Sequence, residues 1–128
     1  MWINGKNQER QKIQTSIINT INNIVEDNQN LINFFYDPSW HIGVLGIIAG
    51  RLMRSNKRPS FVMTDSENFI VGSGRSLGGL NIGTLMMEAA DKGIIIKGGG
   101  HTKACGFTLE KKSWEPFKLF LLDKFTGS

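Results

Sequence analysis

Two glycine-rich stretches interrupt this chain, at residues 72–76 (Gly-Ser-Gly-Arg-Ser) and 97–101 (Lys-Gly-Gly-Gly-His). Each follows an apolar run that is typical of a β-strand, so we expect each to form a tight loop at a strand end. Glycine permits positive φ angles and lets a phosphate oxygen approach bare backbone N–H groups. Arg75 adds a planar fork of donors. The two stretches therefore predict a site for a ligand that carries phosphate, such as a nucleotide or a nucleic acid.

Neither stretch completes a known nucleotide-binding motif. Leu77 stands where a dinucleotide-binding fingerprint starting at Gly72 needs its third glycine, and no Walker A pattern occurs. Judged by spacing alone, residues 72–79 are explained equally well as a flexible connection and as a ligand-binding loop. Three consecutive glycines at 98–100 carry an entropic cost, which favours a specific role for them. The candidate phosphate-binding residues are Ser73, Gly74, Arg75, Ser76, Gly98, Gly99, Gly100 and His101.

Composition limits the other classes of function. The chain has 128 residues, of which 40% are hydrophobic, enough for one domain, and its formal net charge of +4 is compatible with a polyanionic partner. One cysteine excludes an internal disulfide and fits a reducing cytoplasm, and two histidines give no zinc set. The longest apolar run, residues 42–50, is too short to span a membrane. The acidic residues are scattered, so we expect no metal and no catalytic centre on this chain.

Periodicity predicts an α/β fold, in which a small mixed sheet is flanked by helices and preceded by a long amphipathic connecting helix. We expect strand 31–36 to be buried on both faces. Asn81 should cap one helix and Ser113 the last one. The expected elements are helix 7–26, strand 31–36, helix 42–55, a hairpin of strands 60–64 and 69–72, helix 81–92, strands 94–96 and 104–109, and a final helix from Ser113.

Two further side chains, Trp40 and His41, have both a packing and a binding interpretation. Trp40 can stack on a nucleobase and His41 can donate to an anion at a helix N-terminus, but their local sequence favours packing for both. Cys105 lies within a predicted strand, where it is expected to be a small buried hydrophobe.

The order of motifs resembles one family. Residues 40–52 (Trp-His-Ile-Gly-Val-Leu-Gly-Ile-Ile-Ala-Gly-Arg-Leu), Arg58-Pro59, both glycine stretches and residues 104–109 follow each other as in RecJ-type single-strand-specific DNA exonucleases. The resemblance is to the DHH-associated domain of that family, and it extends from Asn7-x-x-Arg10 to about residue 109.

The resemblance implies a division of the parent protein into parts. Residues 1–28 would be a connecting helix and residues 29–128 a DHH-associated nucleic-acid-binding domain. The catalytic DHH domain, with its Mn²⁺ or Mg²⁺ ions, and an oligonucleotide-binding barrel would lie outside this chain. The lack of a clear cap near Met1 agrees with a piece of a longer polypeptide. The chain alone is then expected to be inactive and to bind no cofactor.

The resemblance also implies a function, namely substrate binding in a 5′-to-3′ single-stranded-DNA exonuclease of DNA repair and recombination. Its partners would be single-stranded DNA and the DHH domain of the same polypeptide. Arg75, Ser76 and His101 would lie at neighbouring strand ends and contact the DNA backbone near the scissile phosphate. Trp40, His41 and Lys103 are additional candidate DNA contacts.

The chain departs from the family pattern at a few positions, and two other interpretations stay open. Ile42 replaces a frequent proline, and Thr102, Lys103 and Cys105 replace small apolar residues, which leaves the shape of the histidine loop undetermined. The alternatives are the equivalent domain of a small-oligonucleotide phosphodiesterase in the same superfamily, and a non-catalytic nucleotide-binding module. The residues 40–52 argue against the former.

Overall fold

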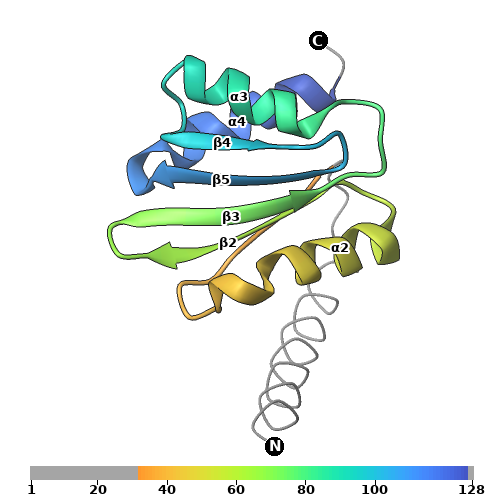
Figure 1. The fold of residues 1–128 in the computed structure, drawn as a ribbon, viewed down its shortest axis with the longest axis horizontal. Coiled ribbons are helices and arrows are strands. Elements are labelled where there is room, and N and C mark those ends of the chain that lie inside the picture. Colours follow the sequence, from red (N-terminus) through yellow and green to blue (C-terminus); the bar gives the residue numbers. More distant parts are fainter. Residues whose placement is uncertain (1–31, 127–128) are drawn as a thin grey trace, which may run out of the picture.

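A computed structural model describes residues 32–126 and shows a five-stranded sheet with helices on both faces (Figure 1). The strand order is β1-β2-β3-β5-β4, in which β1 is parallel to β2 and every other neighbouring pair is antiparallel. The predicted α/β class with a mixed sheet is confirmed. The expected helix 7–26 lies outside the described residues. The elements are β1 (Asn33–Tyr36), η1 (Ile42–Val44), α2 (Leu45–Asn56), β2 (Ser60–Ser66), β3 (Phe69–Arg75), α3 (Ile82–Asp91), β4 (Lys97–Gly100), β5 (Ala104–Glu110), η2 (Lys111–Ser113) and α4 (Trp114–Phe125).

The sheet separates two hydrophobic cores, because successive side chains of a strand point to opposite faces. In β2, Phe61 and Met63 join the larger core with α3 and α4, whereas Val62 joins the smaller core with α2. Figure 1 accordingly shows α2 on one side of the sheet and α3 and α4 on the other.

Helix α3 forms as its sequence predicts. The Asn81 side chain accepts a hydrogen bond from the Thr84 backbone N–H at 3.0 Å, which satisfies one of the free donors of the first turn. Its predicted apolar stripe is buried, and Gly93 ends the helix with φ of 77°. The buried stripe consists of Ile82, Leu85, Met86 and Ala89.

Three expectations about local structure are wrong in whole or in part. The strand expected at 94–96 lies instead at Lys97–Gly100, because Ile96 and its neighbours form a bend. Strand β1, an edge strand, is buried on both faces only in part: Phe34 packs against the larger core and Phe35 against the smaller one, but Tyr36 is 45% exposed. The Ser113 side chain makes no capping hydrogen bond, since this residue ends η2 rather than adopting the extended conformation of a cap.

The central strand β3 brings its neighbours' aromatic rings close to its own backbone. A Cβ at Gly72 would overlap the ring of Phe107, and a Cβ at Gly74 would lie 2.5 Å from the Phe61 ring and 2.8 Å from the Cys105 sulfur. Glycine is thus required on the core face of this strand, where the rings occupy the space that side chains would otherwise fill.

We predict that Gly74→Ala lowers the free energy of unfolding by about 1–3 kcal/mol, the usual cost of overpacking a core. Gly106→Ala is the matched control, because a Cβ there would meet only the Gly72 carbonyl oxygen at 3.8 Å. The control should change stability by less than about 0.5 kcal/mol. Urea unfolding of both variants measures the difference, and equal losses would contradict this account of the strand.

The single thiol is also predicted to be inert. Cys105 is 5% exposed, which confirms its expected burial, and burial raises the pKa of its thiol to about 12. Because the thiolate is the reactive form, the native protein should react with a disulfide reagent at pH 8 far more slowly than the urea-unfolded protein. Absorbance of the released aromatic thiol gives both rates, and similar rates would contradict the prediction.

Candidate nucleic-acid interface

Strands β3 and β4 end at the same edge of the sheet. Both are antiparallel to β5, so they run in the same direction with the start of β5 between them. Arg75 is the last residue of β3, His101 directly follows β4, and Lys103 precedes β5. The structure therefore brings these three residues to one end of the sheet, on the right in Figure 1.

The first glycine stretch is a strand and not a loop, which corrects the sequence-based expectation. Residues 72–75 belong to β3 and pair with β2 on one side and β5 on the other, so their N–H groups lie within the sheet. Gly72 and Gly74 serve the packing of Phe107 and Phe61. A bare backbone anion site at this stretch is excluded by that pairing.

The second glycine stretch is also a strand, and its glycines serve the close approach of α3. A Cβ at Gly83 would lie 2.6 Å from the Gly100 carbonyl carbon, and the Gly83 N–H donates to the His101 carbonyl at 2.9 Å. The His101 N–H donates to the Ala104 carbonyl at 2.6 Å, and a Cβ at Gly98 would lie 2.8 Å from Ile95 Cδ1. In the described sheet β4 is an edge strand that pairs with β5 alone, so this pairing occupies backbone N–H groups on one side of the stretch only.

The Arg75 side chain lies along the bare face of α2. Its Nη1 donates to the Gly74 carbonyl at 2.7 Å. A Cβ at Gly46 would lie 2.6 Å from Nη2, and a Cβ at Gly50 would lie 3.9 Å from Cγ. These glycines leave room for the guanidinium between helix and sheet. Among residues 32–126 no carboxylate forms an ion pair with it, so its charge is available to an anion.

Ser76 holds the two strand ends together. Its side chain is fully buried, its N–H donates to the Lys103 carbonyl at 2.9 Å, and its Oγ accepts from the Gly78 N–H at 3.2 Å. His101 and Lys103 are exposed. Ser76 is thus buried beneath the surface, whereas the side chains of His101 and Lys103 lie on it.

A trough of small residues crosses the sheet beside Arg75. Ser73 pairs with Gly106 and Gly106 with Gly99, so three neighbouring strands carry almost no side chain at this level. A Cβ at Gly99 would meet nothing within 4 Å. Of the described helices, α2 packs on this face, and its sheet contacts are with β2 and β3. The exposed Lys97 lies two residues from Gly99 on the same face.

This trough contains a hollow of about 350 Å³, lined by Lys97, Gly98, Gly99, Gly106, Phe107 and Thr108. Sequence reasoning missed the part played by Gly106, because the row depends on strand register. The available signal was that residues 99 and 106 are glycines within two adjacent strand segments.

Trp40 and His41 lie at the other end of the sheet. They follow β1, which is parallel to β2 and therefore runs toward the end of the sheet at which β3 begins; its last residue, Tyr36, is level with Gly72 of β3. Trp40 packs against the smaller core, in agreement with the packing interpretation, and its carbonyl accepts from the Thr64 hydroxyl at 2.8 Å. His41 is exposed. The structure does not bring these two residues together with His101, whereas the Arg75 guanidinium lies beside Gly46, in the first turn of the helix that follows His41 and η1.

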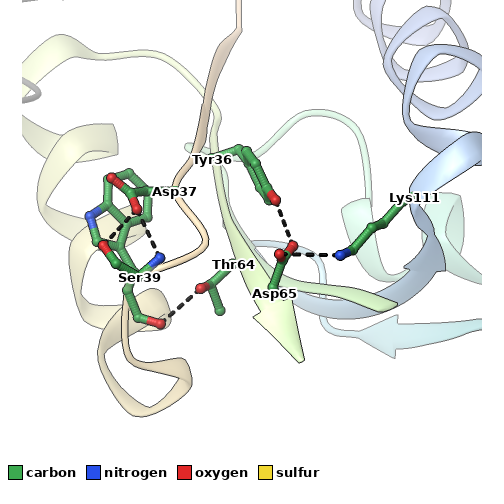
Figure 2. A network of polar contacts seen from close by, with 7 residues as sticks. Tyr36, Asp37, Ser39, Thr64, Asp65 and Lys111 are labelled. Atoms are coloured by element: carbon green, nitrogen blue, oxygen red, sulfur yellow. Dashed lines mark hydrogen bonds and ion pairs between the residues drawn. The ribbon is translucent and has the colours of Figure 1, made fainter. Parts of the chain in front are cut away.

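A polar network occupies that other end (Figure 2). The Tyr36 hydroxyl donates to Asp65 at 2.6 Å, and Lys111 Nζ lies 3.3 Å from the same carboxylate. The hydrogen bond to Asp65 raises the pKa of Tyr36 to about 12 and lowers the pKa of Asp65. Asp37 accepts from the Ser39 hydroxyl, which lowers the pKa of Asp37. The carboxylates of this network are thus engaged by their neighbours, and its cation, Lys111, is already paired.

The described part of the chain contains no set of side chains that could bind a metal ion. Within residues 32–126, no three His, Cys, Asp or Glu side chains cluster closely enough to hold a metal ion. The described residues therefore do not fit a metal centre of their own. None of the helices in residues 32–126 has the length and hydropathy needed to cross a bilayer.

Comparison with known proteins identifies the family. The DHHA1 domain family matches residues 27–125. The single-stranded-DNA-specific exonuclease RecJ of Escherichia coli (strain K12) is 36% identical over 88 residues, which are 66% of this chain and 15% of that protein. The exonuclease of the same name from Bacillus subtilis (strain 168) is 34% identical over 113 residues, 84% of this chain and 14% of that protein. The chain thus spans a small part of the length of these relatives.

Solved structures agree with this assignment. RecJ from Thermus thermophilus in complex with Mn²⁺ superposes with a TM-score of 0.78 at 25% identity, over 92% of this chain and 17% of that one. The C-Ala domain of Aquifex aeolicus alanyl-tRNA synthetase shares the fold alone, with a TM-score of 0.63 at 13% identity over 75% of this chain and 91% of that one. Since the family match covers most of the chain and the relatives are RecJ proteins, this chain belongs to the DHHA1 domain family and is of the RecJ type.

Proposed function

We propose that this chain is the substrate-binding domain of a RecJ-like single-stranded-DNA exonuclease. The relatives that it matches are named as such exonucleases, and the chain corresponds to 14–15% of two of them. Phosphodiester hydrolysis would then be the task of a DHH domain elsewhere in the same polypeptide, and this chain would hold the strand. Its residues 1–28 would connect the two parts.

The observation that carries this proposal is the trough of small residues with the Arg75 guanidinium beside it, which forms no ion pair within residues 32–126. A flat floor of Gly99, Gly106 and Ser73 lets a sugar-phosphate backbone lie close to the sheet. Arg75 is suited to a phosphate because its planar fork matches two phosphate oxygens. Lys97 adds charge on the same face, and Lys103 adds charge at the end of the sheet where β3 and β4 end. Such contacts are to the backbone, so they bind DNA without regard to sequence.

Mn²⁺ or Mg²⁺ would act in the DHH domain, as the structures of RecJ solved with these ions suggest. A metal pair there would polarise the scissile phosphate and generate hydroxide. The present chain would position the strand through Arg75, His101 and Lys103, and it would have no nuclease activity of its own. Ser76 would contribute by fixing the spacing of the two strand ends, since its hydroxyl is already bonded to Gly78.

The isolated chain should bind single-stranded DNA weakly and with strong salt dependence. We expect a Kd on the order of micromolar or weaker, because only one side of the binding cleft is present. Arg75→Ala should reduce the slope of log K against log salt by about 0.7, the value for one phosphate contact on a single strand. Fluorescence anisotropy at several salt concentrations measures both quantities.

Lys92→Ala is the matched control for that titration, because Lys92 pairs with Glu88 on the far end of α3. It removes one positive charge and should leave the slope unchanged. Equal slopes for Arg75→Ala and the parent chain would refute the assignment of Arg75. Salt-independent binding would refute a phosphate-led mode altogether.

In the longer protein that contains this chain, Arg75→Ala should lower kcat/KM on single-stranded DNA by about tenfold to a hundredfold. A charge-assisted hydrogen bond of roughly 1.5–3 kcal/mol corresponds to such a loss. Arg75→Lys should recover part of the activity, since the charge is kept and the bidentate fork is lost. Initial rates on an end-labelled oligonucleotide give these values.

His101→Ala should also slow cleavage, whereas His41→Ala should have no effect, because the two exposed histidines lie at opposite ends of the sheet. Thermal melting checks that each variant is folded. If both Arg75→Ala and His101→Ala melt normally and cleave at the parental rate, this end of the sheet does not bind the substrate near the cut.

A further inference from the structure

Two leucines protrude from the loop between β3 and α3. Leu77 is 48% exposed and Leu80 is 38% exposed, although loops that face solvent usually carry polar side chains. Between them Gly78 and Gly79 adopt φ of 120° and 87°, which only glycine tolerates easily. We call residues 77–80 the leucine loop. Its backbone conformation holds the two apolar side chains outside both hydrophobic cores.

The leucine loop is anchored at both ends to the turn that carries His101 and Lys103. On one side, the Ser76 N–H donates to the Lys103 carbonyl at 2.9 Å. On the other, Asn81 donates from Nδ2 to the Thr102 hydroxyl at 3.4 Å, while its Oδ1 caps α3. The position of the leucines relative to the phosphate-binding end is therefore fixed by hydrogen bonds.

Charge around the leucine loop is positive. The Lys103 side chain passes next to Gly78, where a Cβ would lie 3.5 Å from Lys103 Cε. Neither residues 76–81 nor residues 101–103 contain a carboxylate. An apolar surface beside a cation complements a ligand with apolar faces and anionic links, and a nucleic acid strand with unstacked bases has this chemistry.

From this juxtaposition we propose that Leu77 and Leu80 bind the faces of nucleobases of the DNA strand whose phosphates meet Arg75, His101 and Lys103. This inference rests on the proposed function and adds a second recognition element to it. In a duplex the base faces are stacked on each other and cannot reach the leucines. The leucine loop thereby selects a single strand, whereas the phosphate contacts alone would accept either form.

The test compares two probes of equal length and charge, oligo(dT) and an abasic deoxyribose-phosphate oligomer, each binding to the 128-residue chain in anisotropy titrations. The parent chain should prefer oligo(dT) by about fivefold to tenfold, as burial of two part-exposed leucines implies. Leu77→Ala/Leu80→Ala should abolish that preference, leaving the affinity for the abasic probe and the salt slope unchanged. Leu119→Ala, which truncates a leucine that is 62% exposed on α4, is the matched control.

The outcomes separate this inference from the proposed function. If the parent chain binds both probes equally and the double variant behaves like it, the leucine loop does not read bases, while phosphate binding stands. If the parent chain binds neither probe, the proposed function fails and this inference fails with it. If sedimentation shows that the parent self-associates and the double variant does not, the leucines cover a second copy of the chain, which also overturns the inference. Melting temperatures confirm that the variants are folded.

Discussion

The close contact between aromatic rings and a glycine backbone in β3 determines the rest of this structure. Gly72 and Gly74 face the larger core, where the rings of Phe107 and Phe61 lie against the strand. Because side chains alternate across a sheet, the residues between and after them, Ser73 and Arg75, must face the other side. On one face of this short segment, the rings from the neighbouring strands thus fill the larger core. On the opposite face the segment presents a small hydroxyl and a guanidinium beside α2.

Sequence periodicity was sufficient where local residues decide the structure. Helix α3 follows from its stripe and from the Asn81 cap, and the β2 and β3 hairpin follows from two strands joined by a polar turn. The glycine stretches were misjudged as loops because strand signals come from side chains, which glycine lacks. Residues 72–75 form a strand because they pair with β2 and β5, and the rings of Phe107 and Phe61, which come from those strands, require glycine there. Edge position likewise decides the exposure of β1, and no local pattern shows which strand will be at an edge.

The candidate site was likewise predictable only where it does not depend on contacts between distant segments. That Arg75 and His101 share one end of the sheet follows from two strands running in the same direction, and the structure has this arrangement with the start of β5 between them. The row formed by Ser73, Gly106 and Gly99 depends on register across three strands, which sequence alone does not supply. Trp40 was proposed both as a core residue and as a DNA contact, and its packing against the smaller core supports the former.

The arrangement also suggests why phosphate and base recognition would occur on separate elements. Phosphate contacts gain from a rigid surface, and the trough lies on three hydrogen-bonded strands. Base contacts must tolerate four different bases. An apolar side chain on a loop does so because it packs against the face of any base, whatever hydrogen-bonding groups that base carries. The bond from Ser76 to the Lys103 carbonyl ties the two elements together, so a strand seated on the trough would meet the leucine loop at a fixed spacing. Under the proposed function, this spacing would determine which nucleotide of a single strand lies next to the cut.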